Sequence, residues 1–408
     1  MYPEVTVITE DESTITTTPS QNYNALYCGH FERGPVNELT KIISVYDFKV
    51  TFGKPTADNY QQWFEIYNYF EYGNKCIYIV RTDSKESKKA FYSDANNNYI
   101  SAKNPGEWGN DLRVIFKNNS FKIYYKNELV EEFSSEEYDS HYIDFDLKSE
   151  ELDCTLSGGI HTYDETKIDE AYTIAEDDDS VDFDFILANP AYEYPATRTA
   201  EKKNAIAFVN LPKNDNGYAI CYQGNKKQES IFDGKTYSIP IIGDAFGLRT
   251  YLANNESLNE SHCKRTYKLS NTISAEILKL RELYALNING IAKDSAVGGY
   301  FVNSETMLNG HSLTTTLILN RLKKDCANAV RIYIFEMNDE DTRSQLQKSL
   351  ATLCENYKSS RYISDYKVVC DTSNQSTIEP NSIYADVIIK PIGIIENIKI
   401  RLKAVADM

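Results

Sequence analysis

The chain has 408 residues, more than one hydrophobic core ordinarily uses, so we expect two or three domains. Hydrophobic residues make up 41% and charged residues 25%, a globular composition that excludes general disorder. The formal net charge is -17, opposite in sign to nucleic-acid-binding or membrane-adsorbing proteins, so we expect no direct contact with nucleic acid or membrane.

The first 20 residues predict an extended segment with too few apolar residues for a core of its own. A short strand pattern is followed there by acidic residues, and the segment thus includes Val5, Val7, Ile8, Glu10, Asp11 and Glu12. We interpret residues 1–20 as an arm that adds a strand to another subunit, with a frayed terminus as the alternative. The segment has no basic region followed by an apolar core, so we expect assembly in the cytoplasm.

Residues 21–100 have an α/β pattern. A strand ends at Leu26–Gly29, and Asp58 with Gln61 forms a plausible capping box for an aromatic helix that ends at Gly73. A short apolar strand then runs from Cys76 to Val80. A helix that leads into a buried strand is typical of α/β folds.

A β-rich section interrupts this pattern at about residues 101–180. The turn-dense stretch Asn104–Asp111 precedes predicted strands at 112–117, 121–125 and 129–133, with a hairpin turn at 117–120. The acidic run 176–179 is interpreted as a solvated loop. The α/β pattern resumes with strands at 183–187 and 205–209 and a helix at 197–204, so we predict an inserted domain.

Three amphipathic helices are predicted in the last third, near residues 273–284, 313–326 and 346–357. Strands at 331–335 and 366–370 flank the third helix, and further strands follow at 385–390 and 394–403. The last of these has one apolar and one basic face, formed by Ile398, Ile400 and Leu402 and by Lys399, Arg401 and Lys403.

No motif for catalysis, cofactor binding or metal binding is found. The eight cysteines include no C-x-x-C pair and read as buried apolar residues, and the five histidines are scattered. Gly234-Lys235-Thr236 lacks the upstream glycine of a phosphate-binding loop, because Glu229 holds that position. We therefore predict a protein without enzymatic activity and without a cofactor; an intracellular enzyme with a convergent site is the alternative from another class.

Three stretches resemble the tail sheath proteins of contractile phages and related injection particles. The first runs from Gly34-Pro35 through Phe52-Gly53 to the strand before Arg81. The second, Asn104–Leu112, closely matches the family's Ser-Pro-Gly-Glu-Trp-Gly-Asn motif, where an inserted domain begins. The third comprises Leu286–Ile291, Phe335–Asp339, Cys370-Asp371 and the strands from 385 to 402.

This resemblance implies a multidomain α/β (α+β) fold. It has a sheath-type α/β core, an inserted mostly-β domain, and extended N- and C-terminal strand arms. We predict an arm at 1–20, an outer α/β domain at 21–100 plus 181–250, an inserted domain at 101–180, a tube-proximal α/β domain at 251–385, and an arm strand at 386–408. Arg343 and Lys348, on the polar side of the third helix, are the candidate tube contacts.

The resemblance also implies a structural function. Sheath subunits of this kind form stacked hexameric rings around a tail tube and contract to drive the tube through the host envelope for genome ejection. The implied partners are other copies of the chain, the tail tube protein, and baseplate and tail terminator proteins, and the implied location is the virion. A sheath of a bacteriocin-like or other injection particle, and a tail terminator that does not polymerise, are the alternatives.

Overall fold

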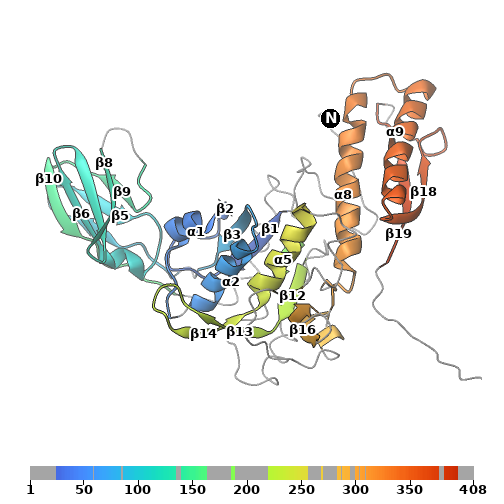
Figure 1. The fold of residues 1–408 in the computed structure, drawn as a ribbon. Coiled ribbons are helices and arrows are strands. Elements are labelled where there is room, and N and C mark those ends of the chain that lie inside the picture. The colour runs from blue at the N-terminus through green and yellow to red at the C-terminus, as the bar shows by residue number, and fades with distance from the viewer. Residues whose placement is uncertain are drawn as a thin grey trace, which may run out of the picture.

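The computed structural model describes residues 24–57, 59–83, 86–134, 139–162, 185–188, 219–255, 268–269, 283–285, 287–294, 299–302, 304–307, 309–375 and 381–393. These residues form a β-rich part at one end, a central α/β part, and a helical part with a small sheet at the other end (Figure 1). The mixed helix and sheet content confirms the predicted fold class.

The central part is built on a mixed sheet. Among the described residues it has eight strands, in the order β15 (Lys268–Leu269), β17 (Gly299–Val302), β16 (Asn289–Asp294), β12 (Ala219–Gln223), β11 (Phe185–Ala188), β1 (Ala25–Gly29), β3 (Ile77–Arg81) and β2 (Leu39–Ile42). The inner pairs, from β16 through β12, β11 and β1 to β3, are parallel, and the outer pairs are antiparallel. The strands predicted at 26–29, 76–80 and 183–187 are thus confirmed.

Helices α1 (Val45–Phe52), α2 (Tyr60–Glu71) and α5 (Ile242–Asn255) accompany this sheet. The predicted aromatic helix is α2, which buries Trp63, Phe64 and Tyr69, and Gly73 follows it with φ +85°. Asp58, the predicted capping residue, lies outside the described residues; the amide of Thr56 instead donates to Asn59 Oδ1 at 2.7 Å just before the helix.

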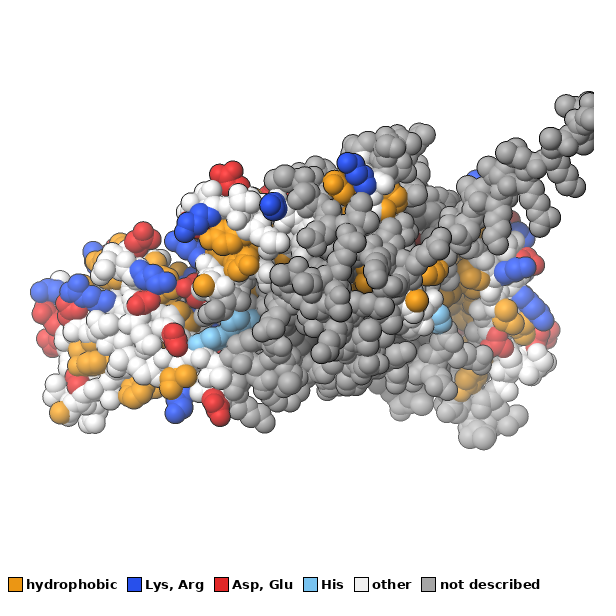
Figure 2. Space-filling view, turned by 90° about the horizontal axis from the view of Figure 1, so that it is seen from below, with side chains coloured by type: hydrophobic (Ala, Val, Ile, Leu, Met, Phe, Trp, Pro, Cys, Tyr) orange, Lys and Arg blue, Asp and Glu red, His pale blue; other side chains and the backbone are white. Residues whose placement is uncertain are grey.

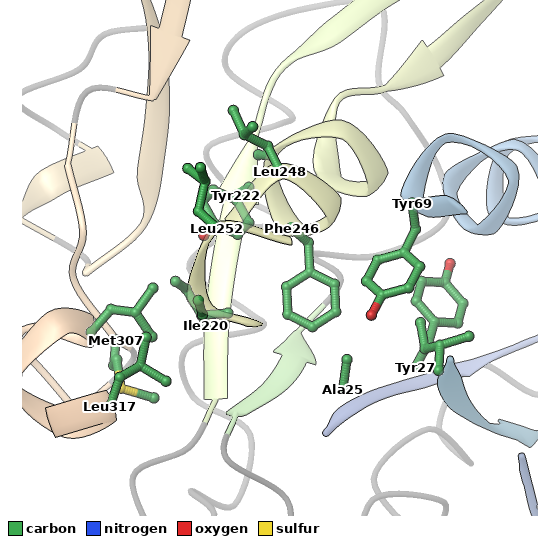
Figure 3. Packing of buried hydrophobic residues seen from close by; sticks show 14 of the residues in the cluster. Ala25, Tyr27, Tyr69, Ile220, Tyr222, Phe246, Leu248, Leu252, Met307 and Leu317 are labelled. Atoms are coloured by element: carbon green, nitrogen blue, oxygen red, sulfur yellow. The ribbon is translucent and has the colours of Figure 1, made fainter. Parts of the chain in front are cut away.

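Helices α2 and α5 pack with their backbones close together. A Cβ at Gly243 would lie 2.1 Å from the carbonyl oxygen of Glu65, so α5 needs glycine there. Next to this contact the rings of Tyr69 and Phe246 pack with centroids 5.6 Å apart. Figure 3 follows the same cluster from Tyr27 past Phe246 to Leu317 of α8 (Leu313–Val330). One continuous core therefore joins the central sheet to the C-terminal helices.

The β-rich part has its own hydrophobic core. Its strands form a three-stranded sheet of β4 (Phe91–Ser93), β5 (Tyr99–Ala102) and β9 (Ile143–Asp146) and a four-stranded sheet of β10 (Glu151–Thr155), β6 (Leu112–Lys117), β7 (Ser120–Tyr125) and β8 (Glu128–Ser134). The predicted hairpin turn is confirmed, because Asn118 and Asn119 have φ of 53° and 59°, as a type I′ turn requires. The core of this part includes residues from Ala90 to Leu156, so its packing begins before residue 101.

A hairpin of β13 (Asn225–Glu229) and β14 (Thr236–Pro240) contains the Gly-Lys-Thr sequence, with Gly234 and Lys235 in its turn and Thr236 at the start of β14. The Asp233 carboxylate accepts from the Lys235 amide at 3.1 Å and from the Tyr237 hydroxyl at 2.7 Å. These residues therefore stabilise a turn.

The C-terminal part consists of α8 (Leu313–Val330), a 3-10 turn η3 (Arg331–Tyr333), α9 (Glu340–Ser359), β18 (Ile363–Val369) and β19 (Asp386–Pro391). The helices predicted near 313–326 and 346–357 and the strands predicted at 366–370 and 385–390 are confirmed. The predicted strand at 331–335 is wrong: the chain there reverses between two helices, and turn bonds such as Glu336 N to Tyr333 O at 3.1 Å replace strand pairing.

Several predicted elements fall outside the described residues. These are the acidic run 176–179, the helix at 197–204, the strands at 205–209 and 394–403, and the helix near 273–284 except for its last two residues.

Candidate assembly interface

The C-terminal sheet is held against a helix that has a well-defined start. Asp339 caps α9, since its carboxylate accepts from the Thr342 amide at 2.8 Å. Leu346 and Leu350 of α9 are buried, and Gln347 donates to the carbonyl of Val368 in β18 at 2.9 Å. The helix therefore covers one face of the sheet and fixes its position.

The sheet itself consists of β18 and β19, which pair antiparallel with a bulge between Ile363 and Asp365. Within the described residues neither strand has a second strand partner, so each presents an outer edge of backbone N–H and C=O groups. Val387 and Ile389 pack toward the core, whereas Ile388 between them is 57% exposed. An edge of this kind can accept a strand from another chain.

The predicted arm strands cannot be placed beside this sheet. Residues 1–23 and 394–408 lie outside the described residues, and with them all the predicted arm positions: Val5, Val7, Ile8, Glu10, Asp11, Glu12, Ile398, Lys399, Ile400, Arg401, Leu402 and Lys403. Residues 386–391, at the start of the predicted C-terminal arm, pair with β18 of the same chain. Pro391, the last residue of β19, lies three positions before residue 394, where the part of the predicted arm that would pair with a neighbouring subunit begins.

The two candidate tube contacts both lie on α9 but differ in environment. Arg343 is half-buried, and its guanidinium donates to the carbonyl and to Oδ1 of Asn338 at 3.3 and 2.7 Å. Lys348 is exposed. Five positions along a helix place the two side chains about 140° apart around its axis. A single flat partner would therefore contact one of them more readily than both.

The loop between α8 and α9 exposes large apolar side chains that the sequence pattern did not identify as a surface. Ile332, Phe335 and Met337 are 74%, 88% and 77% exposed. Phe335 also has φ +74°, a conformation that is uncommon for a bulky residue. Exposed apolar side chains gathered on one loop are typical of a contact surface.

The described part contains no group of three or more His, Cys, Asp or Glu side chains arranged to hold a metal. Six of its seven cysteines are buried, as predicted, and Cys76 is half-buried; all seven are free thiols. The described helices include none long and apolar enough to cross a membrane.

An open hollow of about 420 Å³ lies on the β-rich part and is lined by Phe116, Phe121, Phe145 and the loop 146–150. It contains no histidine or cysteine. Over this end of the molecule Figure 2 shows basic and acidic side chains interspersed, and ion pairs such as Arg113–Asp153 at 2.6 Å account for this. The described side chains on this face thus form no basic stripe of the kind that binds nucleic acid.

Three comparisons place these features among known proteins. Residues 310–404 match the phage tail sheath C-terminal domain family. The tail sheath protein of Vibrio phage KVP40 is 24% identical over 201 residues, which are 46% of this chain and 30% of that protein. The matched region thus spans less than a third of that relative's length.

Solved structures match over almost the whole chain. A sheath tail protein from Listeria innocua superposes with a TM-score of 0.61 at 15% identity, over 92% of this chain and 96% of that one. The contracted helical sheath of the anti-feeding prophage gives 0.54 at 13% identity, over 99% of both chains. These matches confirm the resemblance found in the sequence: the chain has the fold of the sheath proteins of contractile particles, and its residues 310–404 match their C-terminal domain.

Proposed function

We propose that this chain is the structural subunit of a contractile tail sheath. Copies of it polymerise as stacked hexameric rings around a tail tube and contract to drive the tube through a host envelope. The observation that carries the proposal is the match, over 99% of both chains, to a protein that forms a contracted helical sheath. The outer edges of β18 and β19, which have no further strand partner within the described residues, support it, since they are suited to joining subunits.

The arms join one subunit to the next by strand addition. The N-terminal arm carries Glu4, Glu10, Asp11 and Glu12, whereas the C-terminal strand carries Lys399, Arg401 and Lys403. Acidic and basic strands side by side in a neighbour's sheet would stabilise pairing by roughly 0.2–1 kcal/mol per cross-strand pair. A contact between two different surfaces of identical chains continues into a ring or a filament.

Contraction in this scheme is a change between two packings of the same subunits. The extended packing is metastable and the contracted one buries more surface between subunits, while the arms act as hinges. No cofactor and no catalytic step are required. The outer domain (21–100 plus 181–250), the inserted domain (101–180) and the tube-proximal domain (251–385) move together as one subunit, with α9 toward the tube and Arg343 and Lys348 as its two candidate contacts.

The partners in this proposal are other copies of the chain, the tail tube protein, and the baseplate and tail terminator proteins. The particle is either a phage virion or an injection particle without a genome. The match to the tail sheath protein of Vibrio phage KVP40 supports the first possibility, and the matches to sheaths of the anti-feeding prophage and of an extracellular contractile injection system support the second. Capsid genes beside the gene for this chain would identify a phage, and their absence would identify an injection particle.

Electron microscopy tests the proposal. The purified full-length chain, alone and mixed with its tube protein, is imaged in negative stain, and we expect long hollow striated tubes. Deletion of residues 1–18 is expected to leave a folded, soluble monomer that forms no tubes, because it removes the arm strand. Tubes like those of the wild type from the truncated chain would refute the role of the arm, and monomers in every mixture would refute the sheath function.

A further inference from the structure

The loop after β1 connects the central part to the β-rich part through charged side chains. Glu32 accepts a hydrogen bond from the Tyr125 hydroxyl at 2.5 Å. The buried guanidinium of Arg33 donates to the Tyr142 hydroxyl at 3.2 Å, and its carbon lies 4.6 Å from the Tyr142 ring centroid and 5.7 Å from that of Trp108. Trp108 belongs to the sheath-like motif Asn104–Leu112, so this motif residue helps form the junction.

A pair of histidines completes the same junction. His30 follows β1 and His161 follows β10, yet their Nε2 atoms are 3.0 Å apart and their rings stack with centroids 4.3 Å apart. His161 Nδ1 lies 3.4 Å from Asp83, and Asp83 forms a fully buried ion pair with Arg81 at 3.0 Å. Figure 2 shows histidine side chains where the β-rich end meets the rest of the molecule.

The contact between the two histidines requires at least one neutral ring. With one Nε2 protonated and the other bare, the N–H of one ring donates to the lone pair of the other. If both rings were cationic, both Nε2 atoms would carry a hydrogen, the bond would be lost, and two positive charges would lie 3.0 Å apart. The contact therefore excludes the doubly protonated pair.

The surrounding charges do not remove this restriction. Among the described residues the charged groups that interact with the pair are Arg81, from the end of β3, and Asp83, from the loop after it. His30 is only 4% exposed. Burial, His161 and Arg81 together lower the pKa of His30 to about 3, although Asp83 acts in the opposite direction.

We propose that the His30–His161 pair is a proton-sensitive latch that holds the β-rich part against the central part at neutral pH and releases it in acid. When the contact opens, His30 is hydrated and binds a proton below about pH 6.5. The docked state does not bind that proton until about pH 3, so acid favours the open state. Between pH 7.5 and pH 5 the docking equilibrium is expected to fall about 30-fold. This proposal does not depend on the sheath function.

Hydrogen exchange of the full-length wild-type chain tests the latch. Amide exchange is measured by mass spectrometry from pH 7.5 to pH 4.5 and corrected for the intrinsic pH dependence of exchange. We expect peptides covering residues 99–111 to lose protection in acid while peptides covering β12 keep it. The logarithm of the docking equilibrium should change by about one unit per pH unit below pH 6.5.

Three variants test whether the His30–His161 pair causes the loss of protection in acid. His30→Gln removes the buried ring and is expected to flatten the pH profile, whereas His161→Gln is expected to flatten it in part, because burial is the largest cause of the lowered pKa of His30. His141→Gln changes an exposed histidine of the same β-rich part and is expected to keep the wild-type profile. If the β-rich part of His30→Gln is already undocked at pH 7.5, the slope of the wild-type docking equilibrium against pH tests the proposal. A wild-type slope near zero, or a full pH response in both His30→Gln and His161→Gln, would overturn the proposal.

Discussion

A buried ion pair connects the central part to the C-terminal helices, and its removal is expected to weaken the whole subunit. Arg249 of α5 lies 3.5 Å from Glu305, with the two side chains 0% and 8% exposed. The Thr314 hydroxyl at the start of α8 bridges them, donating to Glu305 at 2.6 Å and accepting from Arg249 at 3.2 Å. The network therefore joins α5 to the start of α8 and the loop before it.

The size of the expected loss of stability follows from the burial of the Arg249–Glu305 pair. Glu305→Gln keeps the side-chain shape but leaves the buried guanidinium of Arg249 without this counter-charge, which costs about 3–5 kcal/mol. Thr314→Val removes the bridging hydroxyl and costs about 1–3 kcal/mol. Because both changes disrupt the same network, the double variant is expected to lose less than the sum of the two, by about 0.5–3 kcal/mol.

Urea unfolding followed by circular dichroism, with calorimetry to detect separate transitions, measures these losses. Asp365→Asn is the control, because it removes an exposed ion pair with Lys358 and is expected to leave the unfolding midpoint unchanged. If the free energy of unfolding of Glu305→Gln lies within about 1 kcal/mol of that of the wild type, the charge of the buried pair is not what holds the two parts together.

Three further predictions concern the surface. Phe335→Gly is expected to stabilise the monomer by up to about 1 kcal/mol, because the residue has a positive φ and its ring is 88% exposed; a lower urea midpoint would contradict this. Asn119→Val places a β-branched residue at φ 59° and is expected to destabilise the β-rich part by about 1–2 kcal/mol, whereas Asn119→Gly leaves its melting temperature unchanged or higher. Charge reversal of Arg343 and Lys348 is expected to loosen extended tubes without blocking polymerisation, and electron micrographs with intact extended particles would remove both from the proposed tube contact.

Local signals in the sequence were sufficient for several regular elements, whereas α1 and α5 were not predicted. The aromatic residues of α2 recur at helical spacing, and the acidic start of α9 includes its capping residue Asp339. The turn at Asn118 and Asn119 was predictable because asparagine tolerates positive φ. In each case the determining interactions lie within a few residues of one another.

The features that the sequence did not predict depend on contacts between residues that are distant in the chain. The alternating apolar residues at 331–335 resemble a strand, but the hairpin of α8 and α9 requires a reversal there and leaves Ile332 and Phe335 exposed. The histidines appear scattered in the sequence, yet His30 and His161 meet across 131 positions. Arg33 and Trp108 likewise come together only when the β-rich part folds back on the core. Spacing along one chain carries no signal for such pairs.

A cryo-EM reconstruction of tubes assembled from the full-length chain tests the central claim most directly, because it shows what lies beside β18 and β19. We predict a continuous sheet in which strands from the arms of neighbouring subunits pair with the outer edges of these two strands. Tubes in which the β18–β19 sheet stays two-stranded, with subunits joined through other surfaces, would contradict the account.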